Sequence, residues 1–252
     1  MRNIKLVLEY DGAAFFGFQR QPGKPTVQEA LEKALSAFFD HPVKISAASG
    51  RTDTGVHAEG QVVNFRTGSG RELSHIQRGV NAYLPSAIVV KSAVEVPADF
   101  HARYSARSKV YEYRVWNSPF RAPLLAGRAY HVPFRLDLAA MRKAARHLSG
   151  RHDFRSFTSE AAVLKGRSSR KVSFTRTLRP IRIKKENGLL VFRFEGDGFL
   201  YHMVRNIMGT LLEVGRGKRQ PSDIPSMLKA KSRCFSGQTI PSCGLTLIKV
   251  FY

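Results

Sequence analysis

The order of apolar and polar positions divides the first half of the chain into six predicted elements. Four short segments are strand-like runs of mainly apolar residues. Two other segments have helical spacing; Thr26 and Glu29 form a capping box before the first, and Ser74 opens the second. Proline limits both helices. We therefore predict strands at 4–10, 43–49, 61–67 and 88–96, and helices at 27–38 and from 74 to before Pro85.

The second half repeats this order of elements. Asp137 caps a helix that Gly150 terminates, and Asn187 with Gly188 is a strong signal for a hairpin turn. We predict strands at 109–116, 172–184, 189–195 and 244–251, and helices at 138–148 and 199–214.

Two successive βαββαβ units predict an α+β fold. We expect two ferredoxin-like halves with mainly antiparallel sheets, residues 1–104 and 105–252, and an active-site cleft between them. Two insertions, 117–136 and 156–170, interrupt the second half. The latter is polar and basic, which is typical either of a mobile arm over a substrate or of an ordinary solvated loop.

The charge balance of this 252-residue chain is unusual. Its 41 Lys and Arg against 19 Asp and Glu give a net charge of +22 and a pI of about 10.6. This excess indicates a polyanionic partner, with nucleic acid as the first choice and an anionic membrane as the alternative. No segment has the ~18 apolar residues of a spanning helix, and the first strand begins too early for a signal peptide. Because Cys234 and Cys243 form no metal-binding pattern, we expect a cytoplasmic protein without a structural metal.

Basic residues gather in four groups, which are Arg20 with its two flanking glutamines and residues 103–109, 167–176 and 216–219. Aromatic residues are interleaved with several of them, as in residues 100–116. Arg and Lys bind phosphates while rings stack on exposed bases, so this pattern favours RNA over a duplex read through its major groove.

The segment SGRTDTGVHA, residues 49–58, places one acid, Asp53, in a turn between two predicted strands. Arg51 stands two positions earlier, and small residues surround the acid. A carboxylate on a tight loop held by two strands is well placed for chemistry. The alternative is a β-turn in which Asp53 caps its own backbone.

Arg205 lies at the edge of the apolar stripe of the last predicted helix. A guanidinium there needs a partner because an unpaired buried charge is costly. A carboxylate such as Asp53 is one candidate, and snorkelling of the side chain to water is the alternative. Tyr111 and Tyr113 share one face of the strand at 109–116. We expect Tyr113 in the core, and the pattern does not separate Tyr111 from it.

These residues belong to motifs that follow one another along nearly the whole chain. They are EYDG, FFGFQRQPGKPTVQEALEKAL, SGRTDTGVHAEGQVVNF, NAYLP, FHARYSARSKVYEYRV, GRHDFRSFT, GDGFLYHMVRNIMGTLLEVGRGK and GLTLIKV. In these motifs the chain closely resembles the TruA family of tRNA pseudouridine synthases, and the GRTD-GVHA core is the most specific part. Thr54 and Phe18 stand where alanine and tryptophan are usual in the family.

The resemblance implies an isomerase that converts uridine to pseudouridine at positions 38 to 40 of the tRNA anticodon arm. It also implies a homodimer that needs no metal and no organic cofactor. Asp53 matches the essential catalytic aspartate, and Arg205 matches its basic partner. Arg51 matches a residue that helps to displace the target base, and Tyr111 matches the tyrosine that stacks on it. Further candidates for substrate binding are Arg20, His57 and Lys109.

Two other classes of protein are alternatives. A non-catalytic RNA-binding protein built from RRM modules predicts an RNP1-like run, which QVVNF lacks. A metal-dependent nuclease needs clustered carboxylates, whereas the sequence has one strong acidic loop. Within the synthases, an enzyme that acts on another uridine or another RNA remains an alternative.

Overall fold

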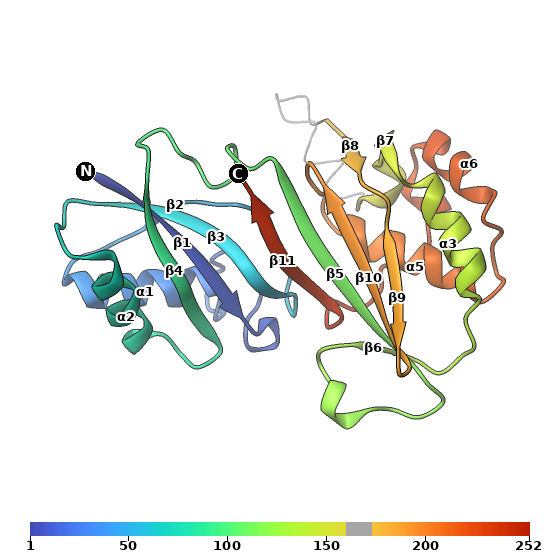
Figure 1. The fold of residues 1–252 in the computed structure, drawn as a ribbon, viewed down its shortest axis with the longest axis horizontal. Coiled ribbons are helices and arrows are strands. Elements are labelled where there is room, and N and C mark those ends of the chain that lie inside the picture. The colour runs from blue at the N-terminus through green and yellow to red at the C-terminus, as the bar shows by residue number, and fades with distance from the viewer. Residues whose placement is uncertain (160–172) are drawn as a thin grey trace. The chain divides into compact units, whose positions relative to one another are not determined.

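The computed structural model describes residues 1–159 and 173–252 (Figure 1). Contacts within the chain define two compact units, Met1–Arg107 with Thr246–Tyr252, and Ser108–Leu245. By these contacts, residues Thr246–Tyr252 of the last strand group with the first unit. Most of the predicted arm over a substrate lies outside the described residues.

The first unit contains a mainly antiparallel sheet and two helices. Its strands have the order β4-β1-β3-β2 with antiparallel neighbours, and β11 joins β3 in parallel. The helices pack against each other, and Phe38 of α1 lies directly against Gly79 of α2. The strands are β1 (Arg2–Tyr10), β2 (Ile45–Ala48), β3 (His57–Thr67), β4 (Ile88–Val96) and β11 (Leu245–Phe251). The helices are α1 (Val27–Phe39) and α2 (Leu73–Tyr83).

The helix signals of the first unit are confirmed at α1 and corrected at α2. Thr26 accepts a hydrogen bond from the Glu29 N–H at 3.3 Å, as a capping residue does. The helix ends at Phe39, and the next residue, Asp40, adopts the left-handed conformation with φ 59°. Ser74 was expected to open α2 but lies inside its first turn. Its hydroxyl donates to the Glu72 carboxylate and caps no backbone N–H.

The second unit is built around β10, which pairs antiparallel with β5, β9 and β8. β7 pairs antiparallel with β8, and the short β6 lies parallel to β5. The strands are β5 (Ser108–Asn117), β6 (Tyr130–Val132), β7 (Gly150–Asp153), β8 (Thr175–Leu178), β9 (Arg182–Glu186) and β10 (Leu189–Gly196). The helices are α3 (Leu138–His147), α5 (Met203–Gly215) and α6 (Asp223–Ala230). Together the units confirm a mixed α+β fold with mainly antiparallel pairing.

Two sequence predictions for the second unit need correction, and one of its helices was not predicted. The strand expected at 172–184 is divided into β8 and β9, because Pro180 lies between them and has no N–H for a ladder. α5 begins at Met203 rather than at 199, since His202 before it has a left-handed backbone with φ 62°. α6 was not predicted, although it buries Ile224. The turn at Asn187 and Gly188 is confirmed, because both residues have positive φ.

α5 is buried around nearly its whole circumference, and not along one stripe alone. The cause is a second main-chain segment that crosses it at Gly209, where an added Cβ would overlap the Gln238 carbonyl oxygen. Gly237 in the same segment also approaches Thr210 closely, since an added Cβ would come within 2.6 Å of the Thr210 nitrogen, and its N–H donates to the Thr210 hydroxyl at 2.8 Å. Two glycines thus allow the segment before β11 to pack directly on the helix.

Gly209→Ala is expected to lower the free energy of unfolding by about 3 kcal/mol, the upper end for an overpacked site. The methyl group would meet a main-chain oxygen of Gln238, which cannot rotate away as a side chain can. Urea unfolding followed by circular dichroism measures the change. Gly68→Ala is the control, because a Cβ there meets nothing within 4 Å. Equal unfolding midpoints for the two variants would contradict the close packing.

Candidate active site

The loop that carries Asp53 connects β2 to β3. It is held by a hydrogen bond within the loop and by contacts with a neighbouring segment of the chain. Within the loop, the Val56 N–H donates to the Asp53 carbonyl oxygen at 3.1 Å, which closes a turn. From outside, the Phe18 N–H donates to the Thr52 carbonyl oxygen at 3.0 Å. Gly17 also lies close, since an added Cβ would come within 2.9 Å of that oxygen. The acid is half-buried on a loop whose backbone is tied down.

His57 is the first residue of β3, and it is only 4% exposed. Its Nδ1 lies 3.0 Å from the Asp11 carboxylate and accepts from the Gly12 N–H at 3.1 Å. Gly12 approaches the loop so closely that an added Cβ would overlap the Val56 carbonyl oxygen. The predicted substrate-binding residue His57 thus contacts the turn after β1, and this turn supports the end of the Asp53 loop.

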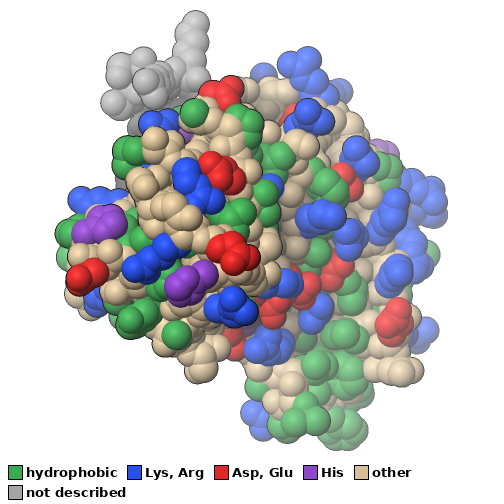
Figure 2. All heavy atoms as spheres, turned by 60° about the vertical axis from the view of Figure 1, so that its left-hand side comes forward, with side chains coloured by type: hydrophobic (Ala, Val, Ile, Leu, Met, Phe, Trp, Pro, Cys, Tyr) green, Lys and Arg blue, Asp and Glu red, His purple; other side chains and the backbone are tan. Residues whose placement is uncertain are grey.

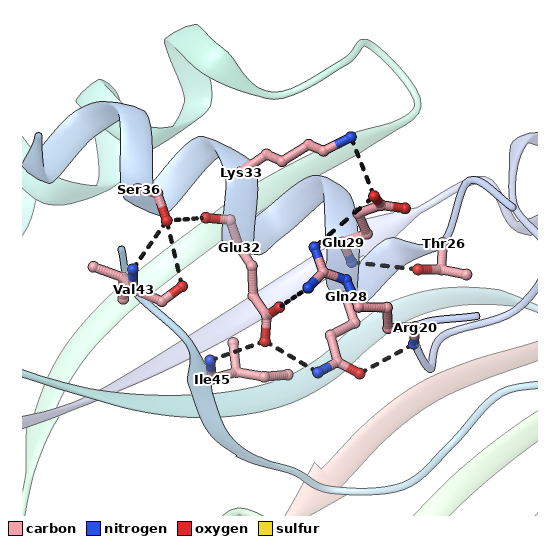
Figure 3. A network of polar contacts seen from close by, with 9 residues as sticks. All are labelled: Arg20, Thr26, Gln28, Glu29, Glu32, Lys33, Ser36, Val43 and Ile45. Carbon is pink, nitrogen blue, oxygen red and sulfur yellow. Dashed lines mark hydrogen bonds and ion pairs between the residues drawn. The ribbon is translucent and has the colours of Figure 1, made fainter. Parts of the chain in front are cut away.

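The two arginines predicted on the first unit differ in their surroundings. Arg51 is exposed on the same loop, two residues before the acid. Arg20 reaches α1, where its guanidinium lies 3.9 Å from the Glu29 and Glu32 carboxylates, and Figure 3 shows it between them. Its backbone N–H also donates to the Gln28 side chain at 3.2 Å. Since half of the Arg20 side chain is exposed, these ion pairs are weak.

The predicted aromatic residues of the second unit lie on β5. Tyr111 is 8% exposed and meets Phe199 edge to face, with ring centroids 5.0 Å apart. Tyr113 is fully buried, which confirms its expected place in the core, and its hydroxyl donates to the Pro241 carbonyl oxygen at 2.7 Å. Lys109, near the start of β5, is half-buried and opposite Gly196 of β10. Tyr111 on β5 therefore packs against Phe199, which lies in the segment between β10 and α5.

Arg205 stands in the first turn of α5 and is half-buried. Its Nε donates to the Ile240 carbonyl oxygen at 2.7 Å, one residue before the carbonyl that accepts from Tyr113. Burial raises the pKa of Tyr113, and the nearby positive charge of Arg205 opposes that rise. The Arg205 and Tyr113 side chains thus both bind the segment at residues 240–241. The hydrogen bond from Arg205 to this segment orients its guanidinium.

The surface is rich in cations. On the face that Figure 2 shows, Lys and Arg side chains are spread widely among fewer Asp and Glu side chains. Among residues 1–159 and 173–252, no helix is long and apolar enough to cross a membrane. In the same part of the chain, no three His, Cys, Asp or Glu side chains are grouped so that they could hold a metal ion.

Comparison with known proteins identifies the family. A family model described as tRNA pseudouridine synthase matches residues 6–105 and 144–252. The chain belongs to this family. The match includes the Asp53 loop, β3 and α5, which confirms the resemblance found in the sequence. Membership makes the chain an isomerase, because a pseudouridine synthase rearranges a uridine without adding or removing atoms.

Relatives of similar length are each named tRNA pseudouridine synthase A. That of Acetivibrio thermocellus is 44% identical over 252 residues, which covers all of both chains. That of Geobacillus kaustophilus is 43% identical over 251 residues, all of this chain and 95% of the relative. That of Herminiimonas arsenicoxydans is 43% identical over 255 residues, all of this chain and 90% of the relative. The similarity therefore spans both units.

Sequence reasoning assigned no role to several residues around the acid. Tyr10 and Gln61 are buried and polar, and Asp11 contacts His57. Tyr10 and Asp11 lie in the EYDG motif, which marks the end of β1. The contacts of Tyr10 and Asp11 could not be predicted from the sequence, because their partners are more than 40 residues away along the chain. Tyr10 and Thr52, for example, are separated by 42 residues.

Proposed function

We propose that the protein converts uridine to pseudouridine at positions 38 to 40 of the tRNA anticodon arm, with Asp53 as the essential acid and without metal or cofactor. The observation that carries the proposal is the half-buried carboxylate on a loop held at Thr52 and Val56, in a chain of this family. The net charge of +22 supports an RNA substrate.

The reaction requires uracil to leave C1′ of its ribose, turn, and return through C5. The base must first leave its stack, and Arg51, which is exposed on the same loop two residues before the acid, is the proposed residue that displaces it. Ionised Asp53 either attacks C1′ or stabilises the positive charge that develops on the sugar. Arg205 is its proposed basic partner, and Tyr111 stacks on the detached base. Arg20, His57 and Lys109 contact the RNA in this proposal.

The architecture proposed with this function has two ferredoxin-like halves, residues 1–104 and 105–252. The antiparallel strand order β4-β1-β3-β2, with α1 and α2 in the connections, supports the assignment for the first half. We also propose a homodimer that acts in the cytoplasm. Size-exclusion chromatography with light scattering tests the oligomeric state directly.

The activity is tested with purified protein, an unmodified tRNA transcript and EDTA. Carbodiimide treatment followed by primer extension marks each pseudouridine as a stop. Stops at positions 38 to 40 support the whole proposal, while stops elsewhere retain the chemistry and reassign the substrate. No stops together with tight binding of tRNA would favour a non-catalytic RNA-binding protein.

Binding of tRNA is expected to weaken steeply with salt, by about 10³-fold between about 50 and 200 mM. The reason is that a chain of net charge +22 releases many counterions when it contacts phosphates. Filter binding at several KCl concentrations measures the slope. The single-turnover rate at saturating protein serves as the control, because it reports on the bound complex. A flat salt response of the dissociation constant would contradict the expectation.

A further inference from the structure

A buried tyrosine reaches the loop that carries the candidate catalytic acid. Tyr10 ends β1 and is 3% exposed, and its hydroxyl lies 2.7 Å from Oγ1 of Thr52. Thr52 is the residue directly before Asp53 and is itself 6% exposed. Burial raises the pKa of Tyr10 to about 12, so its phenol keeps its proton.

The Tyr10 hydroxyl also interacts with a buried amide on β3, the strand that follows the loop. The Gln61 side chain, on β3, is fully buried, and its interaction with the Tyr10 phenol opposes the rise in the Tyr10 pKa. Its Oε1 accepts from the buried Ser49 hydroxyl at 2.5 Å, and its Nε2 donates to the Gly50 carbonyl oxygen at 3.0 Å. The network therefore joins the start of the loop, at residues 49 and 50, to Thr52.

Thr52 is held at two of its atoms from two different segments. Its side chain meets Tyr10, and its carbonyl oxygen accepts from the Phe18 N–H at 3.0 Å. That carbonyl and the Asp53 N–H belong to one planar peptide group. Fixing its plane fixes the point from which the Asp53 side chain leaves the backbone.

We propose that Tyr10 is a positioning residue for the isomerisation, because its hydroxyl, through Thr52, sets the position of the Asp53 carboxylate. This inference rests on the proposed role of Asp53. A misplacement of about 1 Å at a reacting group can cost roughly 100-fold in rate. A purely structural role for the same hydrogen bond would affect stability and leave the rate of the folded enzyme unchanged.

Tyr10→Phe removes only the hydroxyl, and it is expected to lower the single-turnover rate by about 10-fold to 100-fold. The tRNA dissociation constant should stay within about 2-fold, since no RNA contact is removed. Tyr252→Phe is the matched control. Its hydroxyl, in the same unit, donates to the Ala102 carbonyl oxygen at 2.8 Å, away from the loop. That variant should shift the urea midpoint comparably and keep the wild-type rate.

Substitutions at Thr52 provide a second route that does not depend on Tyr10→Phe folding. Thr52→Ser keeps the hydroxyl and should stay within about 3-fold of the wild-type rate, while Thr52→Val should slow turnover as Tyr10→Phe does. The double variant should be no slower than the slower single variant, because both remove one hydrogen bond.

Two results separate this inference from the proposed function. If Asp53→Asn is inactive but Tyr10→Phe turns over as fast as Tyr252→Phe, the positioning role is wrong and the proposed function stands. If wild-type protein forms no pseudouridine, or Asp53→Asn retains activity, the proposed function itself fails. Equal rates for Thr52→Ser and Thr52→Val would also overturn the positioning role.

Discussion

Asp53→Asn is expected to abolish pseudouridine formation, with a loss of roughly 10⁴-fold or more in single-turnover rate. Asparagine keeps the size of the side chain and removes the negative charge. It can neither form an ester with C1′ as readily as a carboxylate nor neutralise a positive charge on the sugar. Binding of tRNA should remain, because cations and not this acid supply the contacts to phosphate.

The measurement is a single-turnover time course with carbodiimide mapping, run beside filter binding of the same tRNA. Asp40→Asn is a suitable control, because Asp40 is exposed after α1 and asparagine tolerates its left-handed backbone. That variant should match the wild type in both assays. Turnover by Asp53→Asn within about 10-fold of the wild type would remove the acid from the mechanism.

Arg205→Ala is expected to lower the single-turnover rate by about 10²-fold to 10³-fold, with a much smaller loss of tRNA affinity. In the proposed function Arg205 is the basic partner of Asp53, and a cation in that role stabilises the negative charge of the carboxylate that the chemistry needs. Its Nε also donates to the Ile240 carbonyl oxygen at 2.7 Å, and this bond aims the guanidinium. Arg205→Lys should recover part of the rate, because it restores the charge without the same geometry.

The contrast between rate and affinity distinguishes this role from a contact to phosphate. Arg142→Ala provides the comparison, since Arg142 is an exposed arginine of the same unit whose guanidinium donates to a backbone carbonyl oxygen. It should retain the wild-type single-turnover rate. Equal losses of rate and affinity in Arg205→Ala would make Arg205 a phosphate contact.

Elements whose signals are local were predicted well from the sequence. β4 has the predicted bounds, and α1 begins after its predicted cap at Thr26. The elements that were missed depend on other parts of the chain. α6 is a short helix, stabilised by burial of one face against the rest of its unit, so its own pattern was weak. The nearly complete burial of α5 also needs the segment with Gly237, which no periodicity within the helix encodes.

The sequence by itself determined the class of fold, the cationic character and the loop with Asp53 as the candidate site, because propensity, period and motif are local properties. Only the tertiary structure decided how that loop is held. The bond from Tyr10 to Thr52 spans 42 residues, and that from Tyr113 to Pro241 spans 128. Such contacts depend on the register of β1 on β3 and on the packing of the chain around α5. A one-residue shift of that register would turn Tyr10 to the opposite face of the sheet.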